Sequence, residues 1–509
     1  MFESYIQKFN NNDTEYVIQL ISNEKSLDFL LQNAPRLYCP DEIIEETFAF
    51  RTWTIRKHLR NTDNGIVMTE FLNDVPWADK YNTINAPLFH HLNEYRYFKN
   101  ADCLLSYIRH FIENIGGNAY QYSTPALTAI YEFLKYTGNE NLISSNAQKL
   151  EAYFNTWEEK HLCENGLYWS FDNYDAMELS ISGTIPDPDA HKIYEDWING
   201  CNPPCISEKI LKGLRPTLNA YMYGDAVTLS KIFELVGNHE KSDYYRIKAL
   251  KIQSLVNEKL WDGDFYKAIH SEDINNDLSF KDLSPERNVR ELIAYNLWSY
   301  CLPSEDKATM FKYLKDDKVF KSPAGFTTAD QSHPLFLYTH PHECLWNGYV
   351  WPYATSQALN GVIALLNNYN QDVINNHDLY EFIKVYAQMH YIDIDGKKIN
   401  WIDEVMHPYP RRWYARDILK KLGNPQTMGG LERGKDYNHS TFIDLVLRGL
   451  VGIDTDADTL TVKPRIKGIW KWFKVENISY KKQTYDIYYD EDGSKYNKGI
   501  GLIIERHST

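Results

Sequence analysis

The sequence contains little cysteine and no long apolar run. Seven cysteines are few for 509 residues and odd in number, which favours reduced thiols over a disulfide framework. No apolar segment approaches membrane-spanning length, and the first residues lack the basic and apolar regions of an export signal. We therefore expect a cytoplasmic protein with no membrane partner; an export signal that has been trimmed away is the alternative.

Runs of basic residues are also missing, and the formal net charge is -15 at pH 7. Nucleic acids and anionic membranes both select basic surfaces, so this charge argues against a nucleic-acid partner and favours a neutral ligand. Cys201 and Cys205 form the only close cysteine pair, without further Cys or His nearby at metal-ligand spacing. We expect no metal and no other cofactor.

The middle of the chain is rich in predicted helices. Residues from about 85 to 450 read as amphipathic helices joined by loops that contain aromatic residues, Asn, Gly and Pro. Three helices are expected to end at Gly138, Gly237 and Gly423, because glycine adopts the left-handed conformation that closes a helix. Repeated helical hairpins are the simplest interpretation. Residues 40–80 instead predict a short strand pair or loop, from their β-branched and aromatic residues.

The composition changes again near residue 454. Beyond it, residues 459–464, 485–489 and 499–504 predict strands. A small β domain is therefore expected at the end of the chain. The expected units are an N-terminal helical segment (1–35), a helical domain (36–453) and a small C-terminal β domain (454–509).

One acidic loop, residues 169–178, carries three carboxylates beside aromatic side chains. Asp172, Asp175 and Glu178 would repel one another if all were ionised, so one of them is a candidate for a carboxyl that stays protonated, as a general acid requires. Trp169 can cover the C–H surface of a sugar ring. A solvated acidic loop is the alternative.

A second acidic pair, Asp403 and Glu404, follows Trp401 in a loop rich in Pro and aromatic residues. Acid pairs commonly cap helices, so this pair alone is a weak signal. Arg411 and Arg412 are candidates for keeping one acid ionised, although two surface arginines explain them equally well. Cleavage of a glycosidic bond requires one carboxylic acid and one carboxylate, so the two loops together favour glycoside hydrolysis.

Two further segments are candidates for ligand binding. Trp346 and Trp351 flank Gly348 and suit either a sugar pocket or the packed start of a helix. Asn219 and Tyr223 are four residues apart on a predicted helix and share a face. Core packing explains the tyrosine about as well as a sugar contact does.

These segments resemble the six-hairpin glycosidases, in the mannosylglycerate-hydrolase-like branch that is related to trehalases and processing α-glucosidases. The resemblance rests on residues 215–223, 346–351 and 401–404, and it covers roughly residues 35–450. It implies a mainly α fold, an (α/α)6 helical toroid (six-hairpin barrel) with the active site at one end, and a small C-terminal β domain. It also implies an inverting mechanism.

The resemblance also implies roles. Glu404 matches the family's general base, at the head of a Glu-x-x-x-Pro stretch. For the acid, alignment on the residues that flank Glu178 favours Glu178, whereas alignment on the preceding aromatic loop favours Asp175. Residues 407–411 stand where relatives tend to have Asp-Pro-x-Thr-Gly, so the sugar preference does not follow from the resemblance.

The expected function is an exo-acting, inverting glycoside hydrolase whose substrate is an α-linked oligosaccharide or small glycoside. A sugar epimerase or lyase on the same toroid, with His439 or Tyr437 as base, and a non-catalytic carbohydrate-binding protein are the alternatives. The sugar, its aglycone and the oligomeric state stay open. The candidates for sugar binding are Arg51, Trp53, Trp77, Trp169, Asp172, Asn219, Tyr223, Trp346, Trp351, Trp401, Asp403 and His439.

Overall fold

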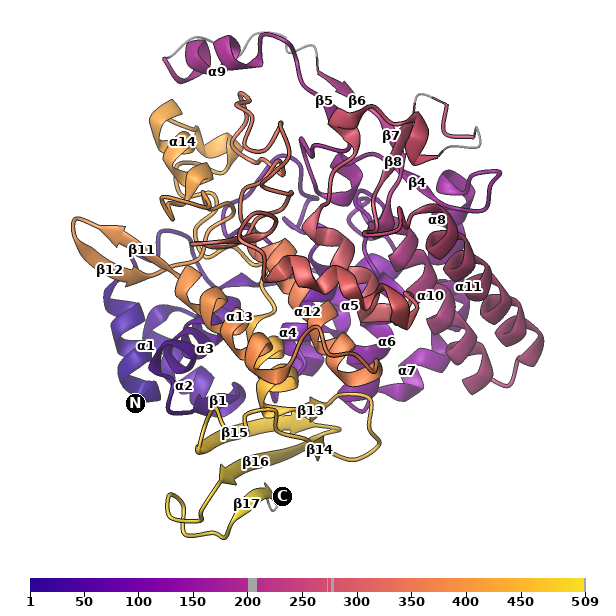
Figure 1. Cartoon of the computed structure of the whole chain (residues 1–509). Helices are drawn as coiled ribbons and strands as arrows, with labels where there is room; N and C mark the ends of the chain where they lie inside the picture. Colours follow the sequence, from indigo (N-terminus) through magenta and orange to yellow (C-terminus); the bar gives the residue numbers. More distant parts are fainter. Residues whose placement is uncertain (200–207, 272, 276–278, 508–509) are drawn as a thin grey trace.

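The computed structural model describes residues 1–199, 208–271, 273–275 and 279–507. Helices occupy the middle of the molecule (Figure 1), and their contacts close them into a ring. Each inner helix packs against the next, and the last packs against the first. The (α/α)6 toroid expected from the sequence is therefore confirmed. The inner helices are α4 (Leu88–Tyr95), α6 (Ala126–Tyr136), α10 (Pro216–Leu235), η6 (Leu292–Tyr300), α12 (Pro352–Asn368) and the continuous pair α15 (Phe442–Asp444) and η9 (Leu445–Val451).

A second set of helices covers the ring from outside. Helix α11 packs along α10 and α13 packs along α12, so the chain passes around the ring as helical hairpins. The outer helices are α3 (Glu42–Ile55), α5 (Leu105–Ile112), α8 (Ala147–His161), α11 (His239–Lys259), η7 (Glu305–Leu314) and α13 (Asn376–Met389).

The hairpin ends use the predicted glycines. Gly138, Gly237 and Gly423 have φ values of 73°, 73° and 66°, in the left-handed region. Glycine adopts this conformation without the steric cost that a Cβ brings. The three predicted helix stops are confirmed.

The expectation for residues 40–80 is right in part. Strands β2 (Leu59–Thr62) and β3 (Gly65–Met68) form the expected short antiparallel pair. Residues 50–55, however, belong to helix α3, so their assignment to extended structure is wrong. Every residue from Ile44 to Ile55 is buried. Tertiary packing on all sides of this helix overrides the β propensity of its Thr, Phe and Ile residues.

The C-terminal strands form one small sheet at the end of the ring opposite strands β4–β8, at the bottom of Figure 1. Its order is β1-β15-β16-β17, so β1 from the N-terminal part of the chain forms one edge. A second pair, β13 with β14, lies beside it. The bounds are β1 (Arg36–Tyr38), β13 (Ile453–Asp454), β14 (Thr461–Val462), β15 (Trp472–Tyr480), β16 (Gln483–Asp490) and β17 (Gly501–Arg506).

Shorter elements complete the part of the chain that the structure describes. Helices α1 and α2 pack on α3 from outside. No helix among the described residues is long and apolar enough to cross a membrane. The remaining helices are α1 (Phe2–Asn11), α2 (Asn23–Asn33), η1 (Arg56–His58), η2 (Ala101–Leu104), α7 (Glu140–Ser145), η3 (Asn173–Asp175), α9 (Ala190–Ile198), η4 (Phe280–Asp282), η5 (Pro285–Arg287), α14 (Tyr414–Leu422) and η8 (Gln426–Met428). The remaining strands are β4 (Trp169–Ser170), β5 (Thr184–Ile185), β6 (Lys209–Ile210), β7 (Lys212–Leu214), β8 (Ile269–Ser271), β9 (Lys321–Ser322), β10 (Gly325–Phe326), β11 (Tyr391–Ile394) and β12 (Lys397–Asn400).

The close contact between α12 and η6 yields a stability prediction. A Cβ added at Gly361 would lie 2.2 Å from the backbone oxygen of Tyr295. Alanine is normally the better helix former by about 1 kcal/mol. Here we expect Gly361→Ala to lower the free energy of unfolding by about 1–3 kcal/mol, because a backbone carbonyl cannot move aside. Urea unfolding followed by circular dichroism measures this change.

Gly449→Ala is the matched control, since its added Cβ would meet the Ile363 Cδ1 methyl at 3.1 Å, at the end of a flexible side chain. We expect this variant to unfold close to the wild-type midpoint. A Gly361→Ala variant as stable as the control would contradict the prediction.

Candidate active site

A cavity of about 290 Å³ lies where the loops that precede the inner helices meet. Loops before α4, α6, α10, α12 and α15 all contribute to its lining. Seven residues named in the sequence analysis are among the lining residues: Trp77, Glu178, Trp346, Trp351, Glu404, Tyr437 and His439. The two acidic loops therefore each bring a carboxyl group to one cavity.

Backbone hydrogen bonds join these loops to one another. The amide of Trp346 donates to the carbonyl of Glu178 over 3.2 Å. This bond places the first acidic loop (169–178) beside residues 346–351, the tryptophan loop. Val350 and Met406 exchange two backbone hydrogen bonds of 2.9 Å, which places the tryptophan loop beside the second acidic loop. The two acids are thus positioned through the segment between them.

The same pattern continues around the cavity. The amide of Asp436 donates to the carbonyl of Ile402 over 2.9 Å, and the amide of Asn438 donates to the carbonyl of Glu70 over 3.2 Å. The segment before α15 is therefore fixed between the second acidic loop and the segment after β3. Backbone bonds of this kind do not depend on side-chain identity, so they leave no signal in the sequence.

Glu178 is partly buried beside the cavity. Burial, with a further contribution from the nearby Glu404 carboxylate, raises the pKa of Glu178 to about 8. Its carboxyl group is therefore protonated at neutral pH. This is the protonation state that a general acid requires.

Glu404 is buried and its carboxylate is bound on both oxygens. Arg433 Nη2 lies 3.0 Å from Oε2, and the sulfur of Cys344 lies 2.9 Å from Oε1. Arg433 also binds Glu343, with Nη1 2.7 Å from Oε1. Burial alone would raise the pKa of Glu343, but its electrostatic interactions with His342 and Arg433 lower it to about 2. Arg433 thus stands between two carboxylates.

A fourth carboxyl group in the cavity, beside those of Glu178, Glu343 and Glu404, belongs to Glu70, which the sequence analysis missed. Its Oε1 lies 3.2 Å from His439 Nε2, and the hydroxyl of Tyr437 bonds to His439 Nδ1. Burial, followed by the charges of Glu404 and Glu178, holds the pKa of Glu70 well above its usual range. The only local signal was Trp77, which lies seven residues later and lines the same cavity.

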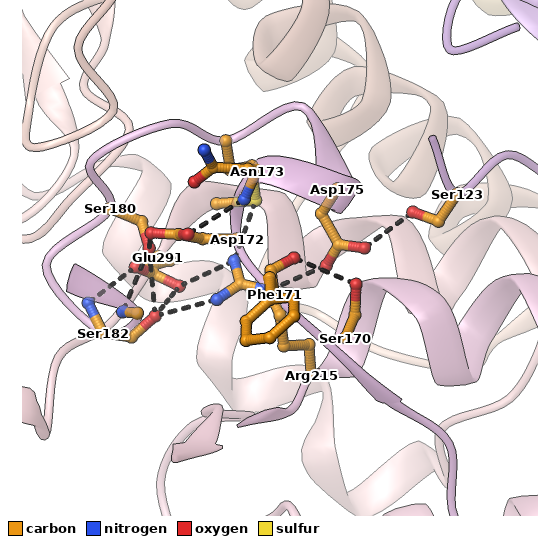
Figure 2. Close-up of polar contacts among 12 residues, drawn as sticks. Ser123, Ser170, Phe171, Asp172, Asn173, Asp175, Ser180, Ser182, Arg215 and Glu291 are labelled. Atoms are coloured by element: carbon orange, nitrogen blue, oxygen red, sulfur yellow. Dashed lines mark hydrogen bonds and ion pairs between the residues drawn. The ribbon is translucent and has the colours of Figure 1, made fainter. Parts of the chain in front are cut away.

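Asp175 lies outside the cavity lining and is engaged elsewhere (Figure 2). Its Oδ2 is 2.7 Å from Arg215 Nε, and its Oδ1 accepts a 2.6 Å hydrogen bond from Ser123. Between the two candidate acids, Ala176 has a φ of 54°, in the left-handed region, and ends the short helix η3. Asp175 therefore faces a buried arginine, whereas Glu178 faces the cavity.

Asp172 also serves the structure of its loop. It accepts hydrogen bonds of 2.7 Å from Thr184 and 3.1 Å from Ser180 (Figure 2 shows Ser180 beside it). Burial raises its pKa to about 6. Trp169, at the start of the same loop, packs on His161 and lies outside the cavity lining.

Four other predicted binding residues lie in the protein interior, away from the cavity lining. The side chain of Arg51 is fully buried, 3.7 Å from Glu94. The ring nitrogen of Trp53 donates to Asn10 over 2.8 Å. Asn219 exchanges two hydrogen bonds of 2.8 Å with the backbone of Tyr168, which join α10 to the first acidic loop. Tyr223, one turn later on α10, is buried in the core.

Trp401 and Asp403 fix the backbone of Glu404 through hydrogen bonds. Trp401 Nε1 donates to Asp403 Oδ2 over 3.1 Å, and Asp403 Oδ1 accepts the Glu404 amide over 2.9 Å. Burial, which Arg416 partly offsets, raises the pKa of Asp403 to about 6. Neither residue is among those that line the cavity.

The arginine that binds the second acidic loop is not one of the two predicted from sequence proximity. Arg411 and Arg412 are both exposed, and Arg412 pairs with Asp417 at 2.6 Å. Their interpretation as surface residues is confirmed. Arg433, which lies 29 positions after Glu404, supplies the charge instead.

Comparison with known families shows to which family the chain belongs. The family model for the mannosylglycerate hydrolase MGH1-like glycoside hydrolase domain matches residues 80–440, well over half of the chain. The chain belongs to this family. The resemblance to six-hairpin glycosidases is thereby confirmed. No curated protein sequence gives a significant match.

Solved structures share this fold. A structure described as a sialidase is 30% identical, with a TM-score of 0.83 over 99% of this chain and 43% of that chain. A GH78 family rhamnosidase of Bacillus sp. GL1 is 14% identical, with a TM-score of 0.52 over 90% of this chain and 40% of that chain. A GH63 mannosylglycerate hydrolase from Thermus thermophilus in complex with glucose is 10% identical, with a TM-score of 0.50 over 79% and 98% of the two chains. The last two show the fold alone, and this chain spans less than half the length of the first two.

Variants of the two candidate acids should differ in their free energy of unfolding. Asp175→Asn removes the nearer of two carboxylate partners of the buried Arg215 and leaves only Glu291, at 3.8 Å, so we expect the free energy of unfolding to fall by about 3 kcal/mol at pH 7. Glu178→Gln should behave differently. A carboxyl whose folded pKa is raised from 4.5 to about 8 stabilises the fold below 4.5, and this contribution is lost as the pH rises through 8.

Glu178→Gln should therefore become more stable than the wild type at pH 9. Urea unfolding of both variants at pH 7 and pH 9 tests the pair of expectations. Undiminished stability in Asp175→Asn together with loss of catalysis would place Asp175 in the chemistry instead.

Proposed function

We propose that this protein is an exo-acting glycoside hydrolase that inverts the anomeric configuration, with Glu178 as general acid and Glu404 as general base. One observation carries the proposal: a single cavity contains a carboxyl group that is protonated at neutral pH and a second carboxyl group bound by a guanidinium. Hydrolysis of a glycoside requires this pair of groups.

In the proposed reaction, Glu178 donates its proton to the glycosidic oxygen as the bond to the anomeric carbon breaks. Glu404 accepts a proton from a water molecule that attacks the opposite face of the sugar. The products are a free sugar and the alcohol of the aglycone. Glu178 then regains a proton and Glu404 loses one to solvent, which restores the starting state.

The cavity favours a neutral terminal sugar. Among its described lining residues, Glu70, Glu178, Glu343 and Glu404 are acidic, whereas Arg433 is the one with a fixed positive charge and is already bound to two of them. An anionic sugar such as a sialoside would meet more carboxyl groups than cations. A volume of about 290 Å³ suits the end of a chain better than an extended polymer, which supports exo action.

The aromatic and polar lining supplies the remaining contacts for such a sugar. Trp77, Trp346 and Trp351 offer ring faces for the C–H surface, and Glu70 and His439 offer hydrogen bonds for hydroxyl groups. Discrimination between sugars rests on these polar groups, because a site built to bind a hydroxyl strongly rejects a sugar that lacks it.

The first test measures sugar release from a panel of α- and β-linked glucosides, mannosides, rhamnosides and arabinosides, with a sialoside included. We expect release from at least one neutral α-glycoside, lowered about 10²–10⁴-fold in Glu404→Gln. Glu164→Gln, at an exposed acid in the loop after α8, is the matched control and should retain full activity. Nuclear magnetic resonance of the first product should show the β-anomer, as inversion requires.

Several outcomes would contradict the proposal. An α-anomer as first product would indicate retention. Undiminished release in Glu404→Gln would assign the base elsewhere. Conversion of a sugar without release of a reducing end would favour an epimerase or lyase, for which His439 and Tyr437 line the cavity as candidate bases.

The second test is the pH dependence of kcat/KM. Glu178 loses its proton as the pH rises through about 8, so we expect activity on an alkyl glycoside to fall above that pH. A 4-nitrophenyl glycoside needs little help from an acid, because its leaving group is already stable as an anion. Glu178→Gln should therefore impair the alkyl glycoside far more than the nitrophenyl glycoside. Equal losses on both substrates would argue against Glu178 as the acid.

A further inference from the structure

The carboxylate of Glu404 is bound by two groups that come from different loops. Cys344, on the loop before α12, donates its S–H to Oε1 with the sulfur 2.9 Å away. Arg433, on the segment before α15, donates from Nη2 to Oε2 over 3.0 Å and to the sulfur of Cys344 over 3.3 Å. All three side chains are buried. The thiol, the guanidinium and the carboxylate therefore form a closed triangle.

Neighbouring contacts fix this triangle from the side of Cys344. Glu343, the preceding residue, binds Arg433 at 2.7 Å, so one stretch of chain holds both the sulfur and the guanidinium. The backbone amide of Cys344 also donates to His342 Nδ1 over 2.9 Å. Cys344 and Arg433 both line the cavity beside Glu404.

We propose that Cys344 is a positioning residue, whose S–H donates to one oxygen of Glu404 while Arg433 donates to the other, so that the carboxylate cannot rotate away from the attacking water. This rests on the proposed role of Glu404 as general base. Cys344 itself does not attack the sugar. Burial and the adjacent Glu404 hold the pKa of the Cys344 thiol well above its usual range, so the sulfur stays protonated and a poor nucleophile.

A thiol suits this position because it is a weak donor. Each hydrogen bond to a carboxylate favours the charged form and makes that carboxylate a weaker base. Arg433 already supplies one charge-assisted bond. A second strong donor would orient Glu404 at the expense of basicity, whereas S–H orients it and leaves more basicity for the proton transfer.

The test compares Cys344→Ala, which removes the donor, with Cys344→Ser, which replaces it with a stronger one. We expect kcat to fall about 10–100-fold in Cys344→Ala and to stay within about threefold of wild type in Cys344→Ser, with KM little changed in both. The acidic limb of the rate profile should lie at lower pH in the serine variant than in wild type, and at higher pH in the alanine variant.

A thiol with only a structural role would not shift the acidic limb of the pH–rate profile in this order among the serine, wild-type and alanine proteins. Cys301→Ser, at an exposed thiol, serves as the control and should match wild type in rate and profile. Equal kcat values and overlapping profiles in the alanine, serine and wild-type proteins would overturn the proposal. So would equal losses in both variants.

A second measurement reports the contact without any turnover. Iodoacetamide alkylation at pH 8, followed by peptide mass spectrometry, gives the rate at Cys344 with Cys301 as internal standard. Glu404→Gln removes the neighbouring negative charge, so we expect Cys344 to react at least about tenfold faster than in wild type. An unchanged rate would overturn the contact.

The two measurements separate two kinds of failure. Absence of sugar release by wild type would overturn the proposed function, and with it the role of Cys344 in that reaction, while alkylation would still report the thiol–carboxylate contact. Sugar release with no effect of Cys344→Ala would overturn the positioning role alone.

Discussion

Closure of six inner helices into a ring is the constraint on which the candidate site depends. Because each inner helix packs against its two neighbours, the loops that precede these helices meet at one end of the ring. Residues as far apart in sequence as Glu70 and His439 thereby come within 3.2 Å of each other. Backbone hydrogen bonds between the loops then fix their spacing, so the cavity is assembled from segments that have no local relation.

The same geometry creates two unlike environments for two glutamates. Glu178 enters the cavity without an ion-pair partner among the described residues, and burial keeps it neutral near pH 7. Glu404 receives Arg433 and Cys344 on its two oxygens. A single guanidinium, that of Arg433, is shared by Glu343 and Glu404. Position in the ring, not residue type, therefore sets the different surroundings of the two carboxyl groups.

The fold and part of the site were predictable where the signal is local. Each of three features can be recognised from a few neighbouring residues: the helix-ending glycines, the tryptophans beside acids and the strands near the end of the chain. The choice between Asp175 and Glu178 depends on tertiary contacts, because Asp175 pairs with the buried Arg215 whereas Glu178 lines the cavity. Glu70, Cys344 and Arg433 escaped prediction because their partners lie on other loops, and Arg411 and Arg412 were favoured only by their nearness in sequence.

Strand β1 has a consequence for the time course of synthesis. Its residue Arg36 pairs with Glu476 on β15, 440 positions later, so one edge of the sheet must wait for almost the whole chain. At roughly 5–20 residues per second, this interval lasts from about twenty to ninety seconds on the ribosome. During that time β1 has an unpaired edge that is open to wrong partners. Helices α1 and α2 can already pack against α3 during this interval, because that packing involves only the first 55 residues. Fewer residues of the N-terminal part therefore stay exposed until β15 is synthesised.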